Sequence, residues 1–288
     1  MRAAAFLGAV LLAATSAGAQ PARPEGAGTV DTPGRQAQAL DRDGKGAEAR
    51  VIWQRLIDNA ADPKEKSEAQ RRMAMSYGFE HNCAGTVKYE EMVIAYWVTR
   101  EQEEPQNAFF QQGEMANEAA RVCIDSGDLA TAEKLYRKGA ELGNKEPEPR
   151  THPKSLWDYR TAHALARLNA RRGNRAEAAK QVALARQILD SDSAMAGPQE
   201  RFYPYLVGYV ALYTNDLKTA EAELTRGLAI RANQNDPFQH YLLALTYEKM
   251  GQTAKATELY RRAYDLSSAH NPPAAFTRSA ARKKIGAS

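Results

Sequence analysis

Three tyrosines stand four residues apart in the stretch FYPYLVGYVALY, namely Tyr205, Tyr209 and Tyr213. Side chains at this spacing share one face of a helix, so the three rings form a continuous stripe. A tyrosine tolerates a half-buried position with its hydroxyl group in water, and such a stripe suits the docking of a peptide. The same pattern is typical of a packed core face. Both interpretations stay open at this point.

Arginines supply the second candidate chemistry. Arg121, Arg167 and Arg171 lie in predicted helices. A guanidinium group binds an acidic group through two parallel hydrogen bonds, so three arginines that meet predict an acidic ligand. The alternative is that these arginines only keep helix surfaces soluble.

Signatures of enzymes are missing from the sequence. It contains no G-x-S-x-G, no H-E-x-x-H and no glycine-rich phosphate loop. The five histidines are scattered, and no two have the i, i+4 spacing of a helical metal pair. His81 and Cys83 suggest a base and a nucleophile, but Cys83 has a better use in a disulfide. We therefore predict no enzyme activity, no cofactor and no metal.

The first residues have the pattern of an export signal. Arg2 precedes an apolar run over residues 3–14, and residues 17–19 form the A-x-A pattern that signal peptidase cleaves. The run is shorter than the roughly 20 residues that span a bilayer. No cysteine lies near the cleavage site, so we expect no lipid anchor. The chain should be periplasmic or secreted.

The chain then divides by composition. We expect residues 1–19 as the signal peptide, residues 20–34 as a disordered leader rich in Pro and Gly that begins at Gln20, and residues 35–288 as the folded domain. The formal charge of +4, one unit of which comes from Arg2, is too small to predict a nucleic-acid partner. A composition of 43% hydrophobic but only 8% aromatic residues suits an alanine-rich helical protein.

Two apolar helical stripes separated by Gly251 occupy residues 237–266. The stripe residues are Leu243, Ala244 and Tyr247 on the first helix, and Ala256, Tyr260, Ala263 and Tyr264 on the second. This order of residues resembles the tetratricopeptide repeat. Similar hairpins recur from residue 35 onward, and residues 134–144 also resemble Sel1-like repeats.

The resemblance implies an all-α fold, a right-handed tetratricopeptide-like α-solenoid of about five to six helical hairpins plus a C-terminal capping helix. The alanines of the last four second helices, from Ala132 to Ala256, are spaced more widely than the family's repeat of about 34 residues. We therefore expect long helices or insertions between repeats.

In tetratricopeptide arrays the first helices line a concave groove, and the resemblance transfers its groove positions to this sequence. The implied groove residues are Arg71, Asn117, Arg121, His163, Arg167, Arg171, Phe202, Tyr205, Tyr209, Tyr213, Tyr241 and Lys249, with Met75, Leu245 and Glu248 at further positions. This groove is basic in its middle and aromatic toward its C-terminal end. The Lys/Asn/Arg set with which some cochaperones bind a C-terminal carboxylate is incomplete, so we do not predict that activity.

The stacking of such hairpins also bears on the two cysteines. In a right-handed stack, the turn of one repeat lies beside the end of the first helix of the next. Cys83 lies at a predicted turn, and Cys123 lies just before the following turn at Gly127. We predict a disulfide between them, with buried free thiols as the alternative.

These features predict a non-enzymatic scaffold or adaptor of the cell envelope that binds a partner protein or an extended peptide in the groove. A second hypothesis is a ligand-binding or catalytic role on a small acidic molecule or a glycan, through the Arg/His/Tyr groove. A third is an architectural subunit of an envelope complex. The fold alone does not select a partner.

Overall fold

The structure is a computed structural model, and it describes residues 32–286. The expected signal peptide and nearly all of the expected leader lie outside the described residues. Between residues 32 and 286 the regular elements are helices: α1 (Pro33–Arg42), α2 (Gly46–Asp58), α3 (Pro63–Phe79), α4 (Cys83–Val98), α5 (Pro105–Ser126), α6 (Leu129–Gly143), α7 (Lys154–Arg171), α8 (Arg175–Ser191), α9 (Ser193–Gln199), η1 (Glu200–Phe202), α10 (Tyr203–Tyr213), α11 (Leu217–Ala229), η2 (Arg231–Asn233), α12 (Pro237–Lys249), α13 (Thr253–Leu266) and α14 (Pro272–Ile285).

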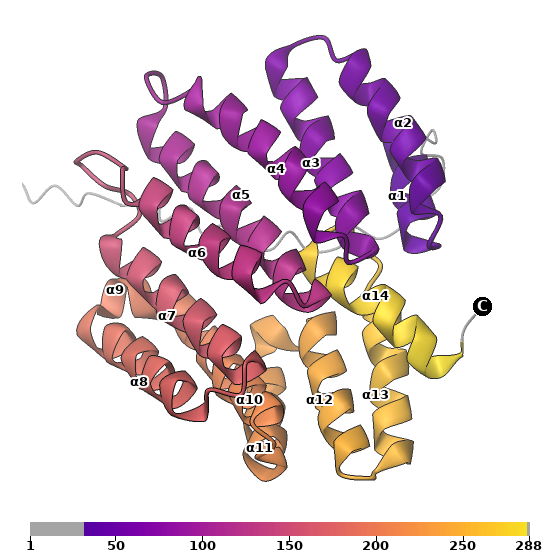
Figure 1. The fold of residues 1–288 in the computed structure, drawn as a ribbon, viewed down its shortest axis with the longest axis vertical. Helices are drawn as coiled ribbons and strands as arrows, with labels where there is room; N and C mark the ends of the chain where they lie inside the picture. Colours follow the sequence, from indigo (N-terminus) through magenta and orange to yellow (C-terminus); the bar gives the residue numbers. More distant parts are fainter. Residues whose placement is uncertain (1–31, 287–288) are drawn as a thin grey trace, which may run out of the picture. The chain divides into compact units, whose positions relative to one another are not determined.

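Within this described range, successive helices pair into six hairpins followed by a terminal helix (Figure 1). The pairs are α1/α2, α3/α4, α5/α6, α7/α8, α10/α11 and α12/α13. The prediction of an all-α, tetratricopeptide-like solenoid with a terminal helix is confirmed. The wide repeat spacing has two visible sources, because α5 extends over 22 residues and the short helices α9 and η1 are inserted between the fourth and fifth hairpins.

Local sequence signals set the helix ends. Pro63 and Pro237 occupy the first turns of α3 and α12, where a missing backbone N–H costs no helical hydrogen bond. The side chains of Asp62 and Asp236 accept hydrogen bonds from backbone N–H groups of the same first turns. The α12/α13 turn at Gly251 has a φ of 75°, a left-handed conformation that glycine adopts without steric cost. These signals explain why the hairpins were readable from the sequence.

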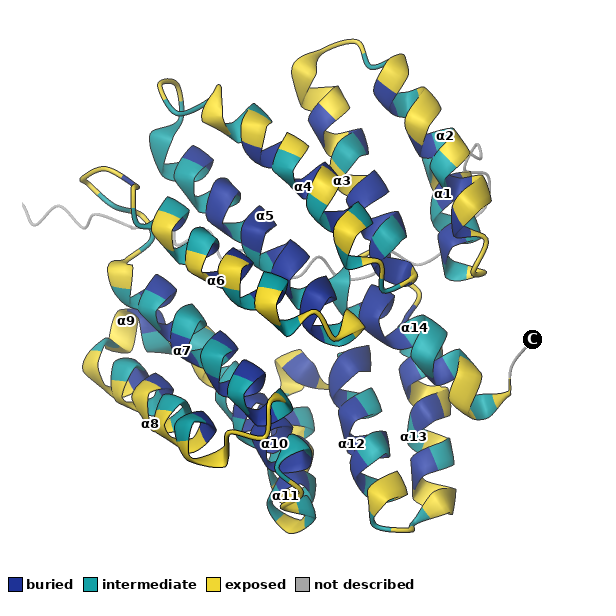
Figure 2. Cartoon of the chain, viewed as in Figure 1, coloured by how far each residue is buried: buried dark blue, intermediate teal, exposed yellow. Residues whose placement is uncertain are grey.

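The core lies between neighbouring helices, whose facing sides are buried while their outer sides are exposed (Figure 2). Four alanines at matching positions of the second helices are almost completely buried, namely Ala132, Ala178, Ala220 and Ala256. A side chain this small lets adjacent helices approach closely. Stability therefore comes mainly from each hairpin burying the apolar face of its neighbour.

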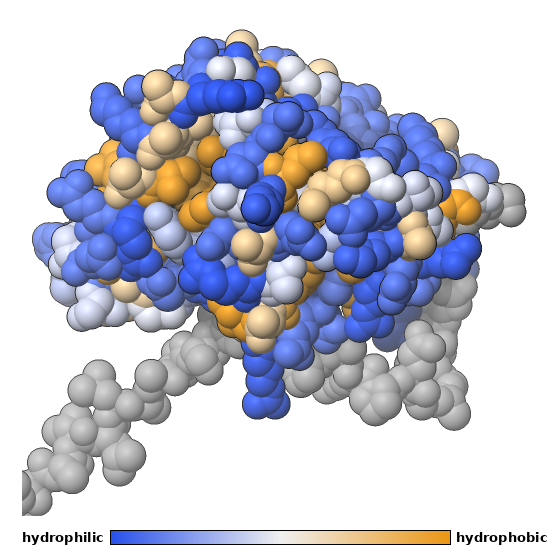
Figure 3. Space-filling view, turned by 90° about the horizontal axis from the view of Figure 1, so that it is seen from below, coloured by the Kyte–Doolittle hydropathy of each residue, from blue (hydrophilic) through white to orange (hydrophobic). Residues whose placement is uncertain are grey.

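The outer surface carries several large apolar residues. Val51, Met92, Val98 and Leu184 are large apolar side chains with exposed positions. On the face drawn in Figure 3, hydrophilic residues predominate and hydrophobic residues lie in patches between them. Such a distribution is normal for a protein surface. Of the helices in the described part of the chain, none is long and apolar enough to cross a membrane.

The terminal helix α14 does more than cap the last hairpin. It packs on α13 and α12 and also on α3 and α5, so it connects the two ends of the array (Figure 1). Asp41 of α1 lies at the centre of this junction with a fully buried carboxylate. It accepts hydrogen bonds from Trp53 Nε1 at 3.1 Å, from Ser76 Oγ at 2.5 Å and from His270 Nε2 at 2.8 Å. We call Asp41, Trp53, Ser76 and His270 the clasp.

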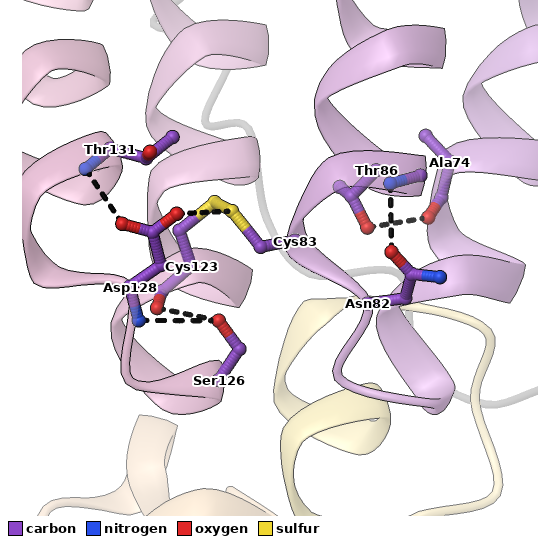
Figure 4. Close-up of a disulfide and its surroundings, with 9 residues drawn as sticks. Ala74, Asn82, Cys83, Thr86, Cys123, Ser126, Asp128 and Thr131 are labelled. Carbon is purple, nitrogen blue, oxygen red and sulfur yellow. Dashed lines mark hydrogen bonds between the residues drawn. A yellow bond between two sulfur atoms is a disulfide. The ribbon is translucent and has the colours of Figure 1, made fainter.

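A disulfide joins Cys83 to Cys123, as predicted (Figure 4). Cys83 begins α4, directly after Asn82, whose side chain accepts a hydrogen bond from the backbone N–H of Gly85. Cys123 is completely buried near the end of α5. The bond thus links the second hairpin to the third at the edge where both turns lie.

Candidate functional site

One cavity of about 360 Å³ lies among the first helices of the hairpins. We call it the central cavity. The sequence-predicted residues that line it are Arg71 from α3, Asn117 and Arg121 from α5, His163 and Arg167 from α7, Phe202 from η1 and Tyr205 from α10. Side chains up to about 130 positions apart in the sequence are therefore brought to one place. Their role in binding stays a prediction.

The remaining predicted groove residues lie elsewhere. Arg171 donates a hydrogen bond to the Tyr209 hydroxyl at 3.3 Å, and its guanidinium lies 4.8 Å from the ring centroid of Tyr213. Tyr241 packs against Tyr260, with ring centroids 5.5 Å apart. Lys249, at the end of α12, is exposed to solvent.

The tyrosine stripe is mostly part of the core. Tyr209 is 0% exposed and Tyr205 is 7% exposed, and both belong to an apolar cluster with Phe238 and Leu224. Burial raises the pKa of both phenols, so they stay protonated and act as hydrogen-bonding groups. Only Tyr205 also lines the central cavity. The packing interpretation of the stripe therefore describes its geometry better than the docking interpretation.

Arg167 is a buried cation whose hydrogen bonds go to neutral groups. Its side chain donates to the Tyr136 hydroxyl at 2.9 Å, the Tyr205 hydroxyl at 3.3 Å and the backbone carbonyl of His163 at 3.3 Å. The residue is only 6% exposed. Within residues 32–286, no carboxylate hydrogen-bonds to it. Burial lowers the pKa of this guanidinium, but the combined effect of the neighbouring tyrosines is larger and raises it, so Arg167 stays charged.

The other three arginines of the central cavity differ in their partners. Arg71 forms an ion pair with Glu118 at 2.7 Å, and Arg160 forms one with Glu114. The guanidinium of Arg121 instead lies 5.1 Å from the ring centroid of Phe276, in a cation–π arrangement. Among the described residues, two of the four arginines therefore form ion pairs with carboxylates, whereas Arg121 and Arg167 do not.

Three neutral polar groups of the lining are buried without a hydrogen-bond partner among the described residues. They are the hydroxyl of Tyr159, Nε2 of His163 and Oε1 of Gln239. Burial, together with the charges of Arg167 and Arg121, lowers the pKa of His163 well below its ordinary value, so the imidazole is neutral. Buried polar groups without partners are rare in native proteins, and they commonly mark an ordered water, an ion or a functional role.

Sequence reasoning missed several lining residues. Glu114 and Glu118 precede Arg121 by seven and three positions on the same helix, so the helical period of α5 could have found them. Tyr136 lies at a position that the repeat pattern gives to packing, and Tyr159 and Gln239 lie at positions for which the sequence pattern predicted no role. No signal in the sequence distinguishes such residues from the rest of the core.

Asp125 lies one turn after Arg121 on α5 and close to Arg167 and Arg171. Burial raises the pKa of this carboxyl to about 6, an effect larger than the opposing attraction of the three arginines. It forms, with Arg171, Tyr209 and Tyr213, a second polar cluster beside the central cavity. The charge of this cluster is therefore sensitive to mild acid.

Glu90 on α4 is 1% exposed, and neither of its carboxylate oxygens has a hydrogen-bond partner in the described structure. Burial, and next the negative charge of Glu118, raise its pKa well above the ordinary value of 4.5, while Arg71 opposes this shift. The folded protein therefore retains a proton that the unfolded chain releases as pH rises above 4.5.

We expect this proton to make stability fall as pH increases. The contribution of protonated Glu90 to the free energy of unfolding is fully present below pH 4.5. It is lost as the pH rises toward the folded-state pKa, at up to about 1.4 kcal/mol per pH unit. Urea denaturation of wild type and Glu90→Gln across this range measures the difference. Glu68→Gln, at an exposed position of α3, is the control and should follow wild type. If the free energies of unfolding of wild type and Glu90→Gln differ by the same amount at every pH, the prediction is wrong.

The family model described as tetratricopeptide repeat matches residues 240–270, which comprise most of the α12/α13 hairpin. Fold and match together define the class: an all-α solenoid of tetratricopeptide-like hairpins. No curated protein matched the chain significantly. Tetratricopeptide repeats generally mediate interactions between proteins. The Sel1-like character of residues 134–144 stays a prediction.

Proposed function

We propose that this protein is a non-enzymatic adaptor of the cell envelope, and that it binds an extended segment of a partner protein along the face formed by α3, α5, α7, α10 and α12. The observation that carries the proposal is the convergence of seven predicted groove residues around the central cavity. Location in the envelope rests on the export pattern of residues 1–19. The disulfide supports it, because such bonds persist in oxidising compartments.

The test is capture of a partner from envelope extract by wild type and by Arg121→Gln. Arg121 is half-buried and its described contact is the Phe276 ring, so the substitution should leave the fold intact. Alanine at Tyr205 or Tyr209 is unsuitable, because both residues lie in the core. We expect Arg121→Gln to weaken capture of the specific partner by about tenfold, the value of one charged hydrogen bond.

The matched control is Arg137→Gln on α6, whose side chain is 58% exposed and pairs only with Glu133 four residues before it in the described structure. This variant also removes one positive charge, but at a position outside the central cavity. It should therefore capture the partner as wild type does. Equal capture by wild type and a folded Arg121→Gln would show that the partner binds another surface.

A further inference from the structure

We propose that the central cavity binds a small organic molecule with one carboxylate group and an aromatic or other apolar body. This site goes beyond the adaptor function and does not depend on a partner protein. Its volume of about 360 Å³ falls in the range of about 300 to 1,000 Å³ that is usual for small-molecule pockets. The arrangement of charges, unpartnered polar groups and aromatic rings selects the chemistry of the ligand.

The charge balance of the lining predicts a monoanion. Four arginines and three carboxylates line the cavity, and His163 is neutral, so one positive charge is in excess. Arg71 and Arg160 are already paired with Glu118 and Glu114. The third acid, Asp236, accepts hydrogen bonds from the backbone at the start of α12. A dianion such as a phosphate monoester would exceed this single surplus charge.

The surplus resides on Arg121 and Arg167. No carboxylate among the described residues hydrogen-bonds to either guanidinium. Taking a guanidinium out of water without a counter-ion is costly, and a carboxylate placed between the two arginines offsets this cost. The carboxyl of Asp125, which lies nearby, attracts Arg171 and also Arg121 and Arg167. When Arg171 and Asp125 are both counted with the lining, one positive charge is still in excess.

The rest of the lining suits an apolar body with a polar edge. Phe202, Phe238 and Tyr205 present aromatic rings to the cavity. The hydroxyl of Tyr159 is buried and without a partner in the described residues, and the residue is only 2% exposed. This hydroxyl can donate to the ligand.

The depth of Arg167 favours a small molecule as its ligand. Arg167 is almost completely buried, so a ligand reaches its guanidinium only from within the cavity. Pro272, at the start of α14, forms part of the wall, and α14 is packed on α3 and α5.

Isothermal titration of the full chain tests this proposal with phenylacetate, indole-3-acetate and hexanoate as probes. Phenylacetamide is the neutral match of the first probe, and phenyl phosphate is the dianionic one. We expect at least one carboxylate to bind, with the matching amide at least tenfold weaker and the phosphate weaker as well. Arg121→Gln should weaken binding at least tenfold, and Arg137→Gln should leave it unchanged.

Arg167→Lys provides a second variant that keeps the charge but loses the forked geometry, and it should also weaken binding. Circular dichroism verifies that each variant is folded. Failure of all three acids to bind wild type, or equal affinity for acid and amide, overturns the proposal. Binding of a blocked Phe-Glu-Phe peptide without binding of any free acid also overturns it, in favour of a polypeptide occupant. Partner capture is measured separately, so either result leaves the adaptor proposal to its own test.

Discussion

Reduction of the Cys83–Cys123 disulfide should lower the free energy of unfolding by about 4 kcal/mol. The bond closes a loop with a sequence separation of 40 residues, and the chain-entropy model assigns a loop of this length about that value. For a protein of this size, the thermal midpoint should fall by roughly 10 °C. Urea denaturation of oxidised and reduced wild type, followed by circular dichroism, measures the effect directly.

The double variant Cys83→Ala/Cys123→Ala should resemble reduced wild type and should not respond to reductant. It serves as the control for effects of the reductant itself. Because Cys123 is completely buried, the variant also loses the packing of one sulfur atom, which makes the oxidised-versus-reduced comparison the cleaner measurement. A difference below 1 kcal/mol between the two wild-type states would contradict the chain-entropy argument.

This prediction bears on where the protein works. The stabilisation exists only while the cysteines are oxidised, which an exported protein achieves and a protein in a reducing compartment does not. The two cysteines are also the features that sequence reasoning placed best. Cys83 follows a turn and Cys123 precedes the next one, so the geometry of stacked hairpins was sufficient to bring them together.

Much of the fold was predictable because its signals are local. Glycines such as Gly127 and Gly251 mark several reversals of the chain, and the apolar stripe of each helix follows a short period. The wide repeat spacing predicted insertions between repeats, but it did not place them at α9 and η1, because the residues of α9 carry no repeat pattern.

The candidate site was predictable only in part. Arg121 and Arg167 were placed by their positions in the repeat, and both line the central cavity. The burial of Tyr209 was not decided by its spacing, because α10 is apolar on most of its surface and the stripe is not its only apolar face. Which tyrosine packs and which lines a cavity depends on neighbouring helices.

The closure of the array was also beyond sequence reasoning. Asp41 and His270 are 229 residues apart, and their contact leaves no periodic trace in the sequence. A buried aspartate at this position looks like any polar residue at the end of a short helix. The clasp therefore required the structure, and it leads to the second large prediction.

Substitution of Asp41 by alanine should destabilise the protein by at least about 3 kcal/mol. It leaves the Trp53 indole N–H, the Ser76 hydroxyl and the His270 imidazole buried without their acceptor, and each buried unsatisfied group costs about 1 to 3 kcal/mol. The Nε2–H of neutral His270 donates to the carboxylate of Asp41. Asp41→Asn keeps one acceptor oxygen at this place, so it should destabilise the protein less than Asp41→Ala does. Asp43→Ala, an exposed position two residues further on, is the matched control.

Urea denaturation compares the three variants. An equal loss of stability in Asp41→Ala and Asp43→Ala would contradict a structural role of the clasp.

The clasp should also control the central cavity. Pro272, two residues after His270, lines the cavity, and Phe276 lies against Arg121. Loss of the Asp41 contacts weakens the attachment of this segment to α1, although Arg42 still binds Ser268 and Arg278. Amide hydrogen exchange in α14 should therefore accelerate in Asp41→Ala before the protein unfolds. Affinity for a bound carboxylate should fall in the same variant, because the wall of the site that α14 forms is then held less firmly.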